Sequence, residues 1–343
     1  VPLLGENRIL VRHGLSRIRQ APSAGVKALL ESAGVNGNVR ASDIGFRLAP
    51  RLNAAGRLGC ARLVVELLTT TSAQRASDLA KFLEGQNLQR QQLERKMLAQ
   101  AREMVNTGDG APALVLASAD WHAGVLGIVA SRLVDRYARP TLLIAIPAAE
   151  GDGDGVAQGS GRSIPGFPLH EALKACDEHL MSHGGHQMAA GFKVRPEGIE
   201  ALRAAFTGYA ARHFPDGPPA PCLTLDAETP LAALTLGMVQ DLDRLEPYGS
   251  ANARPLLLAG GLQLVGEPRK MGGGERHLNF RVRQGAAQLR AVAFGMADRI
   301  DELTSTGGQC CLAFTPKINE WQGRRTVELE VTDFQPGTQA RLH

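Results

Sequence analysis

Hydrophobic positions in the first third of the chain change from short clusters to a long helical repeat. Apolar clusters lie at Val26–Leu30, Ile44–Leu48 and Leu63–Leu68. From Ala76 to Val105, apolar residues recur every three or four positions opposite a polar face, which predicts a long helix that ends at the Gly-Asp-Gly of 108–110. We therefore expect residues 1–75 to be the edge of a domain and residues 76–107 to be a linking helix.

The middle of the chain alternates between strand and helix patterns. A strand at Ala113–Ala117, a helix at Val125–Tyr137 and a strand at Thr141–Ile146 predict a βαβ unit. A flexible loop at 148–155 is expected next. It is followed by a helix at His170–His179, a glycine-rich stretch at 184–191 and a helix at Glu197–His213. Residues 108–214 are thus predicted to form one compact α/β domain.

The last third has the pattern of a small β module. Four prolines between 215 and 221 indicate a linker. Alternating runs follow at Leu278–Val282, Leu289–Phe294, Leu312–Phe314 and Val327–Val331. Such alternation is typical of strands with one buried face. We predict an antiparallel β module at 215–343, which makes the chain an α/β protein with an added all-β domain.

Composition limits the class of protein and the kind of partner. The chain has 343 residues, 44% hydrophobic and 21% charged, and no apolar run approaches the ~20 residues that span a bilayer. Its five cysteines form no Cys-x-x-Cys pair, so we expect a cytoplasmic protein without a disulfide framework. Residues 1–107 contain 16 basic and 8 acidic residues, an excess that suits a polyanion but also occurs on solvated helices.

The first segment of chemical interest is Ala49-Pro50-Arg51-Leu52-Asn53-Ala54-Ala55-Gly56-Arg57. Arg51 and Arg57 flank the amide Asn53 and several small residues, so backbone can approach a phosphate while guanidinium groups donate to it. The start of a helix with two surface arginines would show the same pattern.

The second segment, Asp120-Trp121-His122-Ala123-Gly124, lies between a predicted strand and a predicted helix. Loops at the carboxyl ends of strands hold ligands in open α/β sheets, and a helix N-terminus attracts anions. His122 could donate to a phosphate or position a water molecule, and it could equally be a capping residue.

The third segment is Gly159-Ser160-Gly161-Arg162-Ser163. Two glycines would allow a tight turn whose amides bind one oxyanion, with help from Ser160, Arg162 and Ser163. The spacing is not that of a nucleotide-binding loop, and a purely structural Gly-Ser turn remains an alternative.

The fourth segment, His183-Gly184-Gly185-His186-Gln187-Met188-Ala189-Ala190-Gly191, exposes backbone at Gly184 and Gly185 beside His186. His183 and His186 are too few ligands for a zinc site. Two-metal phosphodiester hydrolysis needs several converging carboxylates and histidines, and no such acidic motif is visible. No serine stands in a nucleophile elbow either.

These four segments occur together in one order, and in this the chain resembles the RecJ family of single-stranded-DNA-specific exonucleases over essentially its whole length. The resemblance implies a DHH phosphoesterase domain with two Mn²⁺ or Mg²⁺ ions and a DHH-associated domain across a groove from it. Residues 1–75 would end the catalytic domain and supply Arg51, Asn53 and Arg57. The associated domain would supply DNA-backbone contacts at Ser160, Gly161, Arg162, Ser163, Gly184, Gly185, His122 and His186, and the two histidines would also support catalysis.

The resemblance also implies that the β module is an oligonucleotide-binding (OB) barrel. Such barrels combine a basic groove with aromatic platforms for bases. Candidates are Phe280, Arg281, Arg283, Arg290, Phe294, Trp321, Arg324 and Arg325. Because some phenylalanines must fill the core, we select Arg281, Trp321 and Arg324.

The chain departs from the family at its defining motif, because the Asp-His-His sequence does not occur in residues 1–343. We expect the metal ligands to precede Val1 and the chain alone to bind single-stranded DNA without cutting it or holding metal. The complete enzyme would be a 5′ to 3′ exonuclease of DNA repair and recombination, with single-strand-binding protein and a helicase as further partners. The alternatives are a short-oligonucleotide or cyclic-dinucleotide phosphodiesterase of the DHH superfamily, and a catalytically inert single-stranded-DNA-binding protein.

Overall fold

The computed structural model describes residues 1–20, 22–106, 110–147, 155–220 and 222–340. The chain divides into two compact units. One contains Arg17–Val39 and Asp43–Pro221, and the other contains Val1–Ser16, Arg40–Ser42 and Cys222–His343. No helix in the described ranges combines the length and the apolar character that crossing a membrane requires.

The described elements of residues 1–106 are all helices, and most of those before residue 73 are short. The helices are α1 (Gly5–Gln20), α2 (Ala24–Ser32), α3 (Ala41–Asp43), a π-helical turn (Ile44–Leu48), α4 (Ala49–Arg57), α5 (Ala61–Thr69) and α6 (Ala73–Asn106). The linking helix α6 begins three residues before the predicted start, since the Ser72 hydroxyl caps it by accepting from the Arg75 amide at 3.3 Å. The predicted stop at 108–110 lies mostly outside the described residues.

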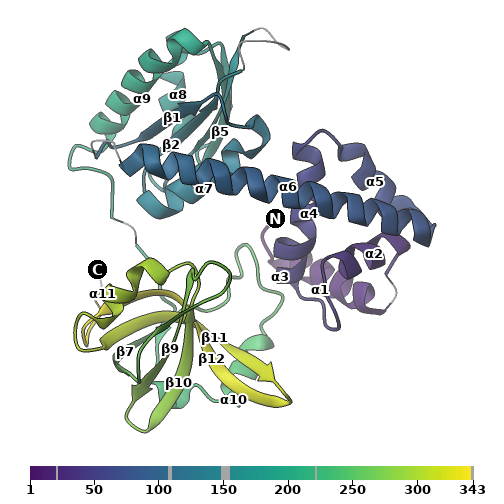
Figure 1. The fold of residues 1–343 in the computed structure, drawn as a ribbon, viewed down its shortest axis with the longest axis vertical. Coiled ribbons are helices and arrows are strands. Elements are labelled where there is room, and N and C mark those ends of the chain that lie inside the picture. Colours follow the sequence, from purple (N-terminus) through teal and green to yellow (C-terminus); the bar gives the residue numbers. More distant parts are fainter. Residues whose placement is uncertain (21, 107–109, 148–154, 221, 341–343) are drawn as a thin grey trace. The chain divides into compact units, whose positions relative to one another are not determined.

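The α/β domain is a five-stranded sheet with helices on both faces (Figure 1). Its strands are β1 (Leu114–Ser118), β2 (Thr141–Ala145), β3 (Ala157–Arg162), β4 (Ser182–Gly185) and β5 (Ala189–Val194), in the order β1-β2-β3-β5-β4. Leu116 and Leu143 pack against α7 (Leu126–Tyr137) and the end of α6. On the other face, Val115 and Ile144 pack against α8 (Leu169–Lys174) and α9 (Ile199–His213). The predicted βαβ unit is therefore present, and the expected loop at 148–155 lies almost wholly outside the described residues.

The prediction that residues 159–163 form a tight turn is wrong, because Gly159 to Arg162 belong to strand β3. A Cβ atom at Gly159 would lie 2.1 Å from the ring of Phe192, and one at Gly161 would lie 2.7 Å from Leu142. The two glycines thus let a phenylalanine and a leucine pack against bare backbone. The predicted helix at His170–His179 is also shorter, since α8 ends at Lys174 and only a 3-10 turn follows at Asp177–His179.

The C-terminal module is a barrel. Its elements are β6 (Ala227–Glu228), α10 (Leu236–Asp243), β7 (Leu257–Leu264), β8 (Arg269–Met271), β9 (His277–Gln284), β10 (Ala287–Ala293), α11 (Ile300–Thr304), β11 (Gln309–Trp321) and β12 (Arg324–Pro336). The strand order is β6-β7-β11-β12-β10-β9-β8, and an additional β7–β9 pairing closes the sheet around an apolar core. The structure confirms an α/β domain followed by a β barrel, although β10 pairs with β12 in parallel rather than antiparallel.

Candidate nucleic-acid interface

Arg57 meets the loop between β1 and α7. Its Nη1 donates to the carbonyl oxygen of Gly124 at 3.0 Å. A Cβ atom at Gly124 would lie 2.6 Å from the carbonyl oxygen of Arg57, so this close approach requires glycine. Nδ1 of His122 accepts from the Gly124 amide at 3.1 Å. His122 therefore has the capping role that the sequence left open, while its side chain stays exposed.

Arg162 lies under the first turn of α7. Its Nη1 donates to the Ser160 hydroxyl at 3.1 Å and to the Gly161 carbonyl at 2.7 Å. An added Cβ at Gly127 would lie 2.5 Å from Nη2 of Arg162, so the guanidinium sits close to the start of this helix. Within the described part of the chain, Arg162 forms no ion pair with a carboxylate. The guanidinium hydrogen bonds to Ser160 and Gly161 thus go to neutral oxygens, near the N-terminus of α7. Such an environment favours a bound anion.

Arg57 is a like charge near Arg162. Burial lowers the pKa of Arg162, and the positive charge of Arg57 lowers it further. Burial also lowers the pKa of Arg90, where Arg57 and Arg132 oppose the stabilising charge of Glu94. We call Arg57, Arg90, Arg132 and Arg162 the arginine cluster. Guanidinium groups stay protonated despite such shifts. Glu94 pairs with Arg90 and Arg132, and among the described residues Arg57 and Arg162 have no carboxylate partner, so their positive charge can be met by a bound anion.

Glu94, Arg90 and Arg132 were missed from sequence. Glu94 is only 3% exposed, and it binds Arg90 at 2.7 Å and Arg132 at 2.5 Å. It therefore ties α6 to α7 and fixes two members of the arginine cluster. The four-residue spacing of Arg90 and Glu94 on a predicted helix was the only available signal, and it is common on solvated helices.

Two predicted phosphate ligands have partners inside the protein. The Arg51 guanidinium pairs with Glu84 of α6 and is largely buried. The Ser163 hydroxyl is buried and donates to the carbonyl of Phe167 at 2.7 Å. The structure gives both residues roles in packing, and their contact with DNA stays a prediction.

Asn53 and Arg57 instead line an open cavity of about 420 Å³ between α4 and α5. Leu52, Gly56, Ala61, Val64 and Val65 complete its wall. Its lining combines the polar side chains of Asn53 and Arg57 with apolar ones, and Arg57 also bonds to the loop at Gly124.

The β4–β5 hairpin brings the glycine-rich segment next to Arg162. Ala189 is paired with Arg162 across β3 and β5, and its carbonyl accepts from the His186 amide at 2.8 Å. Gly184 and Gly185 are exposed strand residues in the same hairpin. The structure thus links His186 to Arg162 through the backbone, and a contact of the His186 side chain with DNA stays a prediction.

Among the described residues, no group of three or more His, Cys, Asp or Glu side chains is placed to hold a metal ion. His183 bonds through Nε2 to the carboxylate of Asp177 at 3.1 Å, which accounts for one histidine of the fourth segment.

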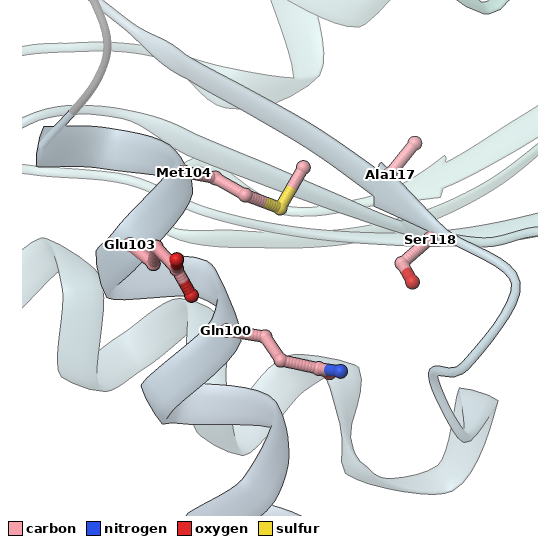
Figure 2. Close-up of a pocket in the computed structure, with 5 residues that line it drawn as sticks. All are labelled: Gln100, Glu103, Met104, Ala117 and Ser118. Carbon is pink, nitrogen blue, oxygen red and sulfur yellow. The ribbon is translucent and has the colours of Figure 1, made fainter.

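A second cavity, of about 410 Å³, lies between the end of α6 and β1 (Figure 2). It is lined by Gln100, Glu103, Met104, Ala117 and Ser118. Among the described residues that line it, the one charged side chain is that of Glu103, which is acidic and would repel a phosphate. Gln100 also accepts from the indole of the buried Trp121 at 3.1 Å, which fixes the start of the loop that ends at His122.

On the barrel, Arg281, Trp321 and Arg324 are all exposed, and Trp321 is paired with Arg324 at the tip of the β11–β12 hairpin. Phe280 is 4% exposed and fills the core, whereas Phe294 is 51% exposed. The prediction that some phenylalanines fill the core is therefore confirmed, with Phe280 in the core and Phe294 on the surface.

Comparisons with known proteins agree with this architecture. A DHHA1 domain matches residues 110–212, and a RecJ OB domain matches residues 225–333. The chain is 35% identical over 335 residues to the single-stranded-DNA-specific exonuclease RecJ of Bacillus subtilis, covering 97% of this chain and 42% of that protein. It is 36% identical to RecJ of Thermus thermophilus, covering 97% of this chain and 46% of that protein.

Solved structures give the same result. The crystal structure of RecJ in complex with Mn²⁺ from Thermus thermophilus superposes with a TM-score of 0.82 and 34% sequence identity. The match covers 99% of this chain and 48% of the RecJ chain. The chain spans about half the length of the curated relatives it matches, between 42% and 59%. With both domains in order and the fold shared with RecJ over 99% of the chain, the chain is homologous to RecJ proteins and corresponds to about half of such a protein.

Proposed function

We propose that this chain is the DNA-binding part of a single-stranded-DNA-specific 5′ to 3′ exonuclease of DNA repair and recombination. In this proposal, residues 1–75 end the DHH catalytic domain, 76–107 link it to the associated domain at 108–214, and 215–343 form the OB domain. The metal ligands lie outside residues 1–343. The observation that carries the proposal is the arginine cluster, in which Arg57 and Arg162 stand near each other without a carboxylate partner in the described ranges.

The chemistry of this site suits a phosphodiester. Arg162 is half-buried, so its contact with a phosphate oxygen would be poorly screened by salt and water. The Ser160 hydroxyl and the first turn of α7 offer further donors beside it. A chain of phosphates rather than one small anion would also use the charge of Arg57, which has no carboxylate partner among the described residues.

Catalysis by metal belongs to the part of the family protein that this chain does not match. RecJ of Thermus thermophilus has been solved with Mg²⁺ and with Mn²⁺. The residues described here lack a fitting ligand group, so we assign no hydrolytic step to them. His122 and His186 would support the DNA backbone near the cut rather than hold ions.

Partners and compartment follow from the same proposal. Arg281, Trp321 and Arg324 on the barrel would bind single-stranded DNA, which single-strand-binding protein and a helicase would present. The protein would act in the cytoplasm, where DNA is repaired.

Binding of a labelled oligothymidylate by the Arg162→Ala variant tests whether Arg162 contacts a DNA phosphate. Loss of one phosphate contact should weaken binding about tenfold and reduce the slope of log K against log salt by roughly 0.7. Arg195→Ala is the matched control, because Arg195 is exposed and follows the opposite end of β5. Equal affinity and slope for Arg162→Ala and the control would overturn the proposal.

Incubation with Mn²⁺ and 5′-phosphorylated single strands tests the second half of the proposal. We expect binding without release of nucleotides. Metal-dependent degradation by the pure chain, abolished by a chelator, would show that the metal site lies within residues 1–343.

A further inference from the structure

Gln100 joins the linking helix α6 to the loop between β1 and α7. Its Oε1 accepts from the indole nitrogen of Trp121 at 3.1 Å, and its Nε2 donates to the carboxylate of Asp120 at 3.4 Å. The hydroxyl of Ser118, the last residue of β1, accepts from the Asp120 amide at 3.1 Å. Figure 2 shows the Gln100 side chain reaching from α6 toward the chain that follows Ser118. One side chain of α6 therefore supplies two of the bonds that hold this loop.

The two partners of Gln100 require an amide between them. An indole nitrogen can only donate a hydrogen bond, and a carboxylate can only accept one. The side chain between Trp121 and Asp120 must therefore accept at one atom and donate at the other. Glutamine does both, whereas glutamate lacks the donor and leucine lacks both groups. The same reasoning fixes the orientation of the Gln100 amide, because the reverse orientation would face donor to donor and acceptor to acceptor.

Trp121 anchors the segment that carries two arginine contacts. Its side chain is 5% exposed and belongs to an apolar cluster formed with α6 and α7. Three residues later in the sequence, the carbonyl oxygen of Gly124 accepts from Arg57 at 3.0 Å. Six residues later, a Cβ atom at Gly127 would lie 2.5 Å from Nη2 of Arg162. A displacement of Trp121 would therefore disturb the surroundings of both arginines.

The linking helix α6 also holds the neighbouring elements. Glu84 of α6 pairs with Arg51 of α4, and Glu94 of α6 pairs with Arg132 of α7 at 2.5 Å. Gln100 adds the loop between β1 and α7 to these ties. All of these residues lie in the same compact unit. One helix thus fixes the places of α4, α7 and the loop between β1 and α7.

The bonds of Gln100 are better suited to orienting the loop than to stabilising the fold. Asp120 is exposed, so a hydrogen bond to its carboxylate replaces one to water and adds little net stability. The apolar cluster already buries the ring of Trp121, and the bond to Gln100 selects one direction for its indole nitrogen. Hydrogen bonds of this kind hold a binding site in its productive geometry.

We propose that Gln100 is a positioning residue of the proposed DNA-binding site. Its amide fixes Asp120 and Trp121, and it thereby sets where Gly124 receives Arg57 and where α7 begins beside Arg162. Gln100 acts through the loop and does not touch DNA. This inference rests on the proposed function, since it assigns a role in the binding of single-stranded DNA.

The Gln100→Leu variant tests the positioning role in a binding assay with labelled oligothymidylate. Leucine removes both hydrogen bonds at similar volume, so we expect the affinity to fall about 3- to 10-fold. Gln92→Leu is the matched control, because Gln92 lies on the same helix and is exposed. It should bind as the wild type does. Melting temperatures of both variants establish that the affinities are those of folded protein.

An exchange of donor and acceptor tests both bonds together. Gln100→Glu keeps an acceptor for Trp121 but places a second carboxylate beside Asp120, so it should weaken binding. Adding Asp120→Asn turns the facing group into a donor and returns the net charge to that of the wild type. Both hydrogen bonds can then form again, and we expect the double variant to regain most of the lost affinity. No recovery in the double variant would overturn the proposal.

Tryptophan fluorescence tests the contact without DNA. The protein has two tryptophans, so Trp321→Phe leaves Trp121 as the single emitter. In this background, Gln100→Leu should shift the emission to longer wavelength, because the indole loses its partner and becomes more accessible to water. An unchanged spectrum would show that Gln100 does not hold Trp121, and it would overturn the proposal.

The outcome separates this inference from the proposed function. Wild-type affinity in Gln100→Leu, together with weakened binding in Arg162→Ala, would overturn the positioning role and leave the arginine cluster as the DNA-binding site. Wild-type affinity in Arg162→Ala would overturn the proposed function, and the positioning role with it.

Discussion

Arg57 donates to the carbonyl oxygen of Gly124, 67 residues later in the chain, at 3.0 Å. The bond joins the end of α4 to the loop before α7, and it holds Arg57 near Arg162. Replacing Gly124 by Ala would place a methyl group 2.6 Å from the Arg57 carbonyl oxygen. The loop or the end of α4 must then move, so we expect affinity for single-stranded DNA to fall about tenfold through loss of one charged contact.

A matched control for Gly124→Ala is Gly85→Ala, where an added Cβ in α6 meets nothing within 4 Å. This control should bind DNA as the wild type does and gain about 1 kcal/mol of stability from helix propensity. Binding of oligothymidylate and thermal unfolding are measured for both variants. Wild-type affinity of the Gly124→Ala variant for oligothymidylate would show that DNA binding does not depend on the position of Arg57.

The Gly159→Ala variant tests whether packing around β3 requires a residue without a side chain at position 159. The new methyl group would lie 2.1 Å from the buried Phe192 ring, so overpacking should lower the free energy of unfolding by about 1–3 kcal/mol. Gly184→Ala in the same sheet meets nothing within 4 Å and should change stability far less. Chemical denaturation compares the two, and equal stabilities would refute the packing role of Gly159.

Sequence patterns predicted the elements whose periodicity is long or regular. The apolar stripe of α6 and the alternation in β9 and β10 each follow from which face is buried, and the structure has all three. Residues 159–163 were misjudged because glycine serves both turns and close packing, and only the position of Phe192 distinguishes them. Arg57 and Arg162 were selected as site residues, and the structure brings them near each other. Glu94 could not be found, since its burial depends on α7, which is distant in sequence.

Glu94→Gln should destabilise the α6–α7 contact. The buried carboxylate is the shared counterion of Arg90 and Arg132, and its loss leaves the partly buried Arg90 without compensation. We expect a loss of about 2–3 kcal/mol, less than for a fully buried pair because Arg132 is 56% exposed. Arg132→Ala is the control, since it keeps the Arg90–Glu94 pair. A smaller loss of stability in Glu94→Gln than in Arg132→Ala would contradict this account.

Alkaline pH should destabilise the protein through two buried thiols. Burial raises the pKa of Cys176 to about 11 and that of Cys310 to about 12. In the unfolded chain both thiols ionise near pH 9, so between pH 9 and these values the folded state binds more protons. Stability is therefore complete below pH 9 and is lost as pH rises through 9 to 12, by about 2 kcal/mol per thiol at pH 10.5. Denaturant unfolding at pH 8 and pH 10.5 measures this loss. In Cys310→Ala the cavity should lower stability at both pH values, but the difference between them should shrink by one thiol's share, and an undiminished difference would exclude Cys310 as its source.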